Sequence, residues 1–131
     1  MTTFTIPGKP HAKQRARFSR RSGRTYTPKE TVSFESTVRG YGMDAIDAPI
    51  DGPVKLTVFA TFEPAKSWSK KKTAERLNRP HTQKPDLDNL VKAIKDGLNR
   101  VAYADDGQVA ETFARKVWGP TAQTVVIVEP L

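Results

Sequence analysis

One amphipathic segment, from about Asp88 to Arg100, constrains the fold of this chain more than any other. On a helical wheel, six apolar side chains in and beside it fall within about 100° of arc, the width of a core-facing stripe. They are Leu87, Leu90, Val91, Ile94, Leu98 and Val101. One polar flank of the same helix is lined by Asp88, Lys92, Asp96 and Asn99. The pattern predicts a helix that packs on a core and keeps one polar side exposed.

A second helix is predicted to begin at the sequence TPKE. Thr27 can cap it, Pro28 suits its first turn, and Glu30 completes a capping box. Apolar side chains follow at i, i+4 and i+7, and they are Phe34, Val38 and Tyr41. We expect these three side chains to form the inner face of the helix.

Four strands are predicted around the two helices. Pro53 to Phe62 alternates apolar and polar side chains, which is typical of a half-buried strand. Thr3 to Pro7 is a shorter strand, and two more, about Gln108 to Trp118 and Gln123 to Val128, close the chain around a turn. The order β-α-β-α-β-β predicts an α/β (α+β) fold. We expect one compact domain, residues 1–131, in which a small mixed sheet packs with two main helices.

The charge of the chain favours a polyanionic partner. It has 22 lysines and arginines against 14 aspartates and glutamates, a formal net charge of +8, and this balance points to nucleic acid before a membrane surface. The lack of cysteine excludes disulfides and thiolate metal sites and fits a reducing compartment. The sequence shows neither an apolar run of membrane length nor the layout of a signal peptide. We therefore expect a soluble protein of the cytoplasm.

The acidic residues are unevenly placed, since five of the 14, all aspartates, lie between Asp86 and Asp106. Asp86 and Asp88 can serve one site only if the helix begins near Asp88, because residues two apart share a face in extended backbone but not in a helix. Pro85 favours such a start. The chain can then fold Asp105 and Asp106 back toward the beginning of the helix. Short carboxylates suit hard cations such as Mg²⁺, so a divalent-metal site is predicted here.

A simpler interpretation is also open. Asp88, Lys92 and Asp96 could form a surface ion-pair ladder, with one aspartate as a plain N-cap and ADDG as a turn. Other metal or nucleophile schemes fit poorly, because His11 and His81 are isolated in the sequence. Each histidine is expected to be a polar loop residue.

Two motifs carry a resemblance to a known family. The sequence KPDLDNLVKAIKDGLN followed by YADDGQV resembles the RusA-type Holliday junction resolvases, endodeoxyribonucleases common in prophages. IPGKPHAKQRARF, YTPKE and SWSKKK look like the phage-borne branch of that family. The similarity spans nearly the whole chain.

The resemblance implies a homodimeric endonuclease that resolves four-way DNA junctions in recombination and repair, in a bacterial or phage-infected cell. It would cut two opposed strands symmetrically with Mg²⁺, or Mn²⁺ in its place. Some of the apolar residues on the two helices should then be buried between the subunits. The family's catalytic, metal-binding aspartates map onto Asp86, Asp88 and Asp106, and its essential lysine maps onto Lys92. Lys92 would either position the attacking water or neutralise phosphate charge. Asn89 and Asp96 are expected to support the metal ligands without binding the metal. Asp105 is expected either to do the same or to cap the turn, because neighbouring side chains point to opposite faces and Asp105 and Asp106 cannot both face one site. Tyr103 stands where some relatives have tryptophan, which leaves any junction-opening aromatic unassigned.

Two basic segments are expected to contact DNA. Residues 9–24, expected to be a solvated loop or arm, and 66–84, with a short helix capped by Ser69, hold 14 of the 22 basic residues and one acidic residue, Glu75. The side chains expected to bind phosphate are Lys13, Arg15, Arg17, Lys70, Lys71, Lys72, Arg76 and Lys84. Trp68 and Phe18 could stack on unpaired bases or simply anchor their loops.

Two other functions stay open at this point. One is a Mg²⁺-dependent nuclease that acts on other branched or single-stranded DNA. The other is a non-catalytic basic DNA-binding protein whose aspartates are structural. Paired symmetric nicks in a four-way junction would distinguish the resolvase from both.

Overall fold

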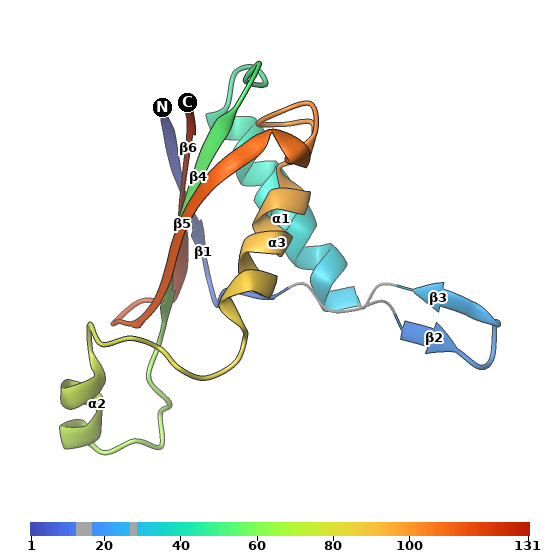
Figure 1. Cartoon of the computed structure of the whole chain (residues 1–131). Coiled ribbons are helices and arrows are strands. Elements are labelled where there is room, and N and C mark those ends of the chain that lie inside the picture. The colour runs from blue at the N-terminus through green and yellow to red at the C-terminus, as the bar shows by residue number, and fades with distance from the viewer. Residues whose placement is uncertain (13–16, 27–28) are drawn as a thin grey trace.

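A four-stranded mixed sheet forms the body of the molecule (Figure 1). The computed structural model describes residues 1–12, 17–26 and 29–131. Its sheet is ordered β1-β6-β4-β5 and comprises β1 (Thr2–Pro7), β4 (Val54–Phe62), β5 (Val109–Trp118) and β6 (Gln123–Pro130). β6 pairs antiparallel with β1 and with β4, whereas β5 runs parallel to β4. The predicted α+β class and mixed sheet are confirmed.

β4 is the central strand, and it separates two strands that follow each other in the chain. Phe59 of β4 lies opposite Val125 of β6 on one side and opposite Arg115 of β5 on the other. The turn after β5 therefore does not join a hairpin. Alternate side chains of β4 are buried toward the helices, as the sequence pattern predicted, and they are Val54, Leu56, Val58, Ala60 and Phe62.

Two helices, α1 (Lys29–Ala45) and α3 (Leu87–Gly97), cover one face of the sheet (Figure 1). The predicted stripe of α3 is confirmed at its centre, where Leu90 and Ile94 are fully buried. The helix ends at Gly97 and not at Arg100 as expected, because Arg100 adopts a left-handed backbone conformation (φ 68°). Among the described residues, no helix is long and apolar enough to cross a membrane.

Glycines bring α1 and α3 into close contact. A Cβ on Gly42 would lie 2.6 Å from Leu98 Cδ2, and one on Gly97 would lie 2.8 Å from Val38 Cγ1. Gly42, which is buried, therefore takes the inner position that was expected for Tyr41. Tyr41 is exposed (39%), so that part of the predicted inner face is wrong. A phenol ring has no room at the position of Gly42, because even a Cβ there would clash with Leu98.

Both basic segments contain local structure. In the first, β2 (Arg17–Ser19) and β3 (Arg24–Tyr26) form a two-stranded ribbon around an exposed turn, where a solvated loop or arm was expected. In the second, α2 (Lys70–Arg76) begins at Ser69, whose side chain accepts a hydrogen bond from Lys72 N–H, as predicted. The predicted cap at Thr27 and Pro28 lies outside the described residues.

The stretch after α2 attaches to the free edge of β5. Backbone hydrogen bonds run from Trp118 N–H to Arg79 O and from His81 N–H to Lys116 O. His81 is buried (6% exposed), and its ring stacks on Phe62 with centroids 4.0 Å apart. It is therefore part of the core and not a polar loop residue, because the attachment to β5 turns its ring inward.

Candidate active site

The loop before α3 sets the position of the first two aspartates. Asp86 is the N-cap residue in extended conformation (φ −66°, ψ 141°), and Leu87 is the first helical residue. The predicted start of the helix is thus confirmed to within one residue. The Asp86 side chain makes no capping hydrogen bond, so the interpretation of Asp86 as a plain side-chain N-cap is not supported.

A short 3₁₀ turn, η1 (Asp106–Gln108), sets the position of the second pair. Asp105 Oδ2 accepts a hydrogen bond from Gly107 N–H at 3.0 Å and caps this turn. Asp106 is then free to point elsewhere, and it lines a groove beside α3. Asp105 caps the turn, one of the two roles predicted for it, but Gln108 belongs to η1 and β5 begins at Val109.

Gln108 holds η1 against the rest of the molecule. Its Oε1 accepts hydrogen bonds from the N–H groups of Ala104 (2.9 Å) and Asp105 (3.1 Å). Its Nε2 donates to Ile50 O (2.8 Å) and Gly52 O (2.9 Å). One amide side chain therefore joins the Asp105–Asp106 turn to the loop that precedes β4.

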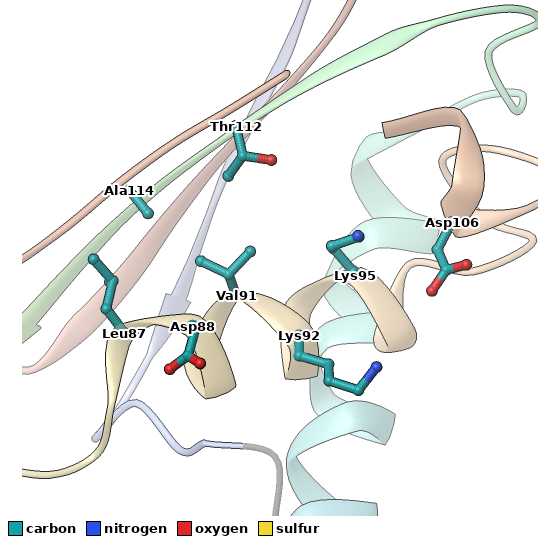
Figure 2. A pocket seen from close by; sticks show the side chains of 8 residues that line it. All are labelled: Leu87, Asp88, Val91, Lys92, Lys95, Asp106, Thr112 and Ala114. Carbon is teal, nitrogen blue, oxygen red and sulfur yellow. The ribbon is translucent and has the colours of Figure 1, made fainter. Parts of the chain in front are cut away.

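A groove of about 610 Å³ between α3 and β5 is lined by one aspartate from each acidic cluster, Asp88 and Asp106 (Figure 2). Its lining residues are Leu87, Asp88, Val91, Lys92, Lys95, Asp106, Thr112 and Ala114. Asp88 and Asp106 lie toward opposite ends of the groove in Figure 2, and the ammonium groups of Lys92 and Lys95 lie between them. The groove thus combines two carboxylates with two lysine ammonium groups, and its remaining lining is mostly apolar.

The carboxylates near η1 also affect the pKa of Tyr103. Burial raises the pKa of its phenol first, and the carboxylates of Asp106, Asp96 and Asp105 raise it further. The hydroxyl donates a 2.8 Å hydrogen bond to Lys95 O, and the side chain is fully buried. Tyr103 therefore supports the last turn of α3 and is not placed to stack on a DNA base.

The residues that line the groove could hold a divalent cation together with a substrate. Within residues 1–12, 17–26 and 29–131, no three histidine or acidic side chains are grouped closely enough to hold a metal ion by themselves. Asp88 and Asp106 nevertheless face one groove. Mg²⁺ is commonly bound by one or two carboxylates plus substrate phosphate and water. Either carboxylate therefore fits a cation whose coordination is completed by substrate phosphate and water.

The other predicted site residues do not line this groove. Asp86 is exposed at the start of α3, and Asn89 and Asp96 are half-buried on that helix. Asn89, Asp96 and Asp86 stay predictions as ligands or supporting residues. Asn99 lies just past the helix, where its backbone carbonyl accepts a 2.9 Å hydrogen bond from Arg39.

Two polar groove residues were missed from the sequence. Lys95 follows Asp88 and Lys92 at i+7 and i+3, so helical spacing could have placed it on the same face. Thr112 comes from β5, and its place could not be found without knowing that β5 lies beside α3. Lys95 makes the groove more basic than predicted, and Thr112 adds a hydroxyl group.

Some of the predicted DNA-binding residues lie outside the part of the chain that the structure describes. Lys13 and Arg15 are not among the described residues, and the side chain of Arg17 is not described either. Exposed basic side chains on and near α2 are Lys70, Lys71, Lys72, Arg76 and Lys84. Trp68 packs against Trp118 with centroids 4.8 Å apart, and Lys72 Nζ lies 4.3 Å above its ring. Trp68 therefore anchors its loop, one of the two roles considered for it.

A basic chain that gathers carboxylates in one groove has the features of a phosphodiester-cleaving enzyme. The family model described as Endodeoxyribonuclease RusA matches residues 7–129, and the chain belongs to this family. The chain is also similar to the uncharacterized protein YqaN of Bacillus subtilis (strain 168). The two are 35% identical over 133 residues, which covers 95% of this chain and 93% of YqaN. The resemblance seen in the motifs is confirmed.

Proposed function

We propose that this protein is a divalent-metal-dependent endodeoxyribonuclease that resolves four-way DNA junctions by cutting two opposed strands symmetrically. The observation that carries the proposal is the shared groove of Asp88 and Asp106, in a chain with net charge +8 that belongs to an endodeoxyribonuclease family. Within the groove, the carboxylates of Asp88 and Asp106 would repel a phosphate that comes close to them. A bound divalent cation would offset this repulsion.

Each groove residue has a task in this proposal. Asp88 and Asp106, with Asp86 at the edge, would hold Mg²⁺ or Mn²⁺ through carboxylate oxygens. When bound, such a cation lowers the pKa of bound water and withdraws charge from the phosphate. Lys92 either orients the attacking water or offsets charge on the phosphate, and both roles need its ammonium group inside the groove. Lys95 adds a second positive charge there.

The exposed lysines of α2 would bind the DNA backbone at a distance from the cut. Lys70, Lys71 and Lys72 are consecutive on a short helix, and Trp68 fixes that helix to the sheet. Contacts of this kind give affinity without sequence readout. The proposed specificity is therefore for the shape of a branched DNA.

A substrate panel tests the proposal. The protein is incubated with a labelled four-way junction, a flap, a single strand and a linear duplex, each with Mg²⁺. We expect paired, symmetric nicks in the junction and slower cutting of the other three. Faster cutting of the flap or the single strand would indicate a nuclease of another specificity. Binding without any cutting would indicate a DNA-binding protein.

Aspartate variants connect the activity with the groove. Asp88→Asn should abolish cleavage and leave junction affinity equal or higher, because a negative charge near the phosphate is removed. Asp47→Asn, in an exposed loop, is the matched control and should cut normally. A loss of folding in Asp88→Asn, seen by circular dichroism together with lost binding, would favour a structural role for this aspartate.

A further inference from the structure

Lys116, on β5, clamps the loop that leads into α3. Its Nζ donates two hydrogen bonds of 2.7 Å, one to Gln83 O and one to Pro85 O. The chain bends across residues 83–85, so a single ammonium group joins both ends of this bend. The residue that follows the clamp is Asp86.

The side chain of Lys116 is unusual for an edge strand, where lysine normally extends into water. It is half-buried, on the face of β5 that carries Thr112 and Ala114 toward the groove. Burial lowers the pKa of Lys116, and the nearby carboxylate of Asp86 acts in the opposite direction. Partial desolvation of an ammonium group is unfavourable unless its donors are satisfied, and here two of the three are bound to carbonyls.

The clamp lies where other attachments of this segment end. Backbone hydrogen bonds tie Arg79 and His81 to β5, but the described backbone bonds to that strand stop at His81. Lys116 extends the attachment to Pro85, one residue before the helix cap. Asp86 itself has an extended backbone and no side-chain capping bond. Its direction therefore depends on how the preceding bend is held.

We propose that Lys116 is the positioning residue for Asp86: by holding both ends of the 83–85 bend, it presents the Asp86 carboxylate toward the groove as a ligand for a divalent cation. The inference rests on the proposed function in one respect, the binding of a cation between the aspartates. It adds a residue outside the groove that acts through the backbone and contacts neither metal nor DNA. Groups that orient metal ligands in this way strongly affect metal affinity.

Metal binding by the intact protein tests this role without relying on activity. In Lys116→Met, which keeps the apolar stem and removes the donors, we expect Mn²⁺ affinity measured by calorimetry to fall by about tenfold or more. The metal concentration for half-maximal junction cleavage should rise in parallel. Junction binding in EDTA should stay within about twofold, because Lys116 is not expected to contact phosphate. Lys116→Arg, which can donate to both carbonyls, should recover most of the metal affinity.

Arg39→Met is the matched control, because Arg39 also donates to a backbone carbonyl, that of Asn99, at the far end of α3. It should lower the melting temperature of the metal-free protein and leave Mn²⁺ affinity unchanged. Equal Mn²⁺ affinity in Lys116→Met and the wild type would overturn the proposal, and so would an equal loss in Arg39→Met. If Lys116→Met does not fold, Lys116→Gln is titrated in its place, and unchanged Mn²⁺ affinity would again overturn it. A wild type that binds Mn²⁺ but cuts no junction would contradict the proposed function and leave this comparison intact.

Discussion

Asp105 and Asp106 are neighbours with different surroundings, and their variants should behave differently. Asp106→Asn is expected to stop junction cleavage and to preserve junction binding, because Asp106 faces the groove. Asp105→Asn should keep measurable activity, since an amide oxygen can still accept the bond from Gly107 N–H that caps η1. Single-turnover cleavage and gel-shift binding of both variants give the comparison. If Asp105→Asn is inactive and Asp106→Asn still cuts, Asp105 and not Asp106 is the residue needed for cleavage.

That Asp105 caps the turn while Asp106 faces the groove could be predicted, because adjacent side chains in a turn or strand point in different directions. The role of Gln108 could not. Two of its four hydrogen-bond partners, Ile50 and Gly52, lie more than 50 residues away in the chain. The same limit applies to His81, whose burial follows from an attachment to a distant strand edge.

His81 should make stability depend on pH. Burial, and then the positive charge of Lys116, hold the pKa of His81 below the usual 6.5. A backbone hydrogen bond opposes them, and Lys9 lowers the pKa by a smaller amount. As pH falls below about 6.5, the unfolded chain takes up a proton on this imidazole that the folded protein does not, so the free energy of unfolding decreases. Guanidinium titrations at pH 7.5 and 5.5 should show this loss, and His81→Phe should reduce it. An equal loss in His81→Phe would assign the effect to other groups.

At the scale of elements, the contact between α1 and α3 depends on glycine. A Cβ on Gly97 would lie 2.8 Å from Val38 Cβ and 3.0 Å from Glu35 O, which belongs to the α1 backbone and cannot move freely. Gly97→Ala should therefore lower the free energy of unfolding by about 1–3 kcal/mol despite the better helix propensity of alanine. Gly40 lies on the exposed side of α1, where a Cβ would meet no atom of a neighbouring element within 4 Å, so Gly40→Ala should raise the free energy of unfolding by up to about 1 kcal/mol. Denaturant titration measures the free energy of unfolding of both variants. A stabilised Gly97→Ala would mean that α1 and α3 can move apart without loss of stability.

Local signals predicted where elements begin, and non-local contacts decided how they pair. Pro85 correctly marked the start of α3, and Ser69 the start of α2. The end of α3 was missed because the left-handed Arg100 accompanies a hydrogen bond from its N–H to Tyr103 O. The insertion of β4 between β5 and β6 has no local signature, since strand pairing is decided by contacts far apart in the chain.

α2 should contribute to DNA affinity in a salt-dependent way. If about six to ten phosphates are neutralised in the complex, affinity should fall on the order of a thousandfold or more between 50 and 200 mM salt. Replacing Lys70, Lys71 and Lys72 together by glutamine should reduce the slope of log affinity against log salt by about 2 to 3. Fluorescence anisotropy with a labelled junction measures this slope. An unchanged slope would mean that α2 does not contact DNA.

At the scale of the whole molecule, paired incision needs two active sites, which a two-fold symmetric dimer supplies. Apolar residues of the two helices were expected to lie between the subunits, but those of α3 are buried inside one subunit. The sheet face turned away from α1 and α3 carries Phe59, Val125, Ile127 and Phe113, and Phe113 is 51% exposed. We therefore place the proposed contact with a second copy on this face.

Two charge substitutions separate the sheet face from the helix face. Phe113→Glu puts a carboxylate on β5, where Phe113 meets Phe59 edge-on with centroids 5.9 Å apart, and should dissociate a sheet-to-sheet dimer. Met43→Glu changes the most exposed apolar side chain of the described part of α1 (63%) and should leave the dimer intact. Sedimentation velocity at micromolar concentration gives the mass, and a plasmid-borne junction shows whether nicks come in pairs. Phe113→Glu should be monomeric and should nick single strands without pairing the cuts. If Met43→Glu alone dissociates the dimer, the interface lies on the helices. If the wild type is monomeric and still cuts both strands in one encounter, the proposal of a dimer is wrong.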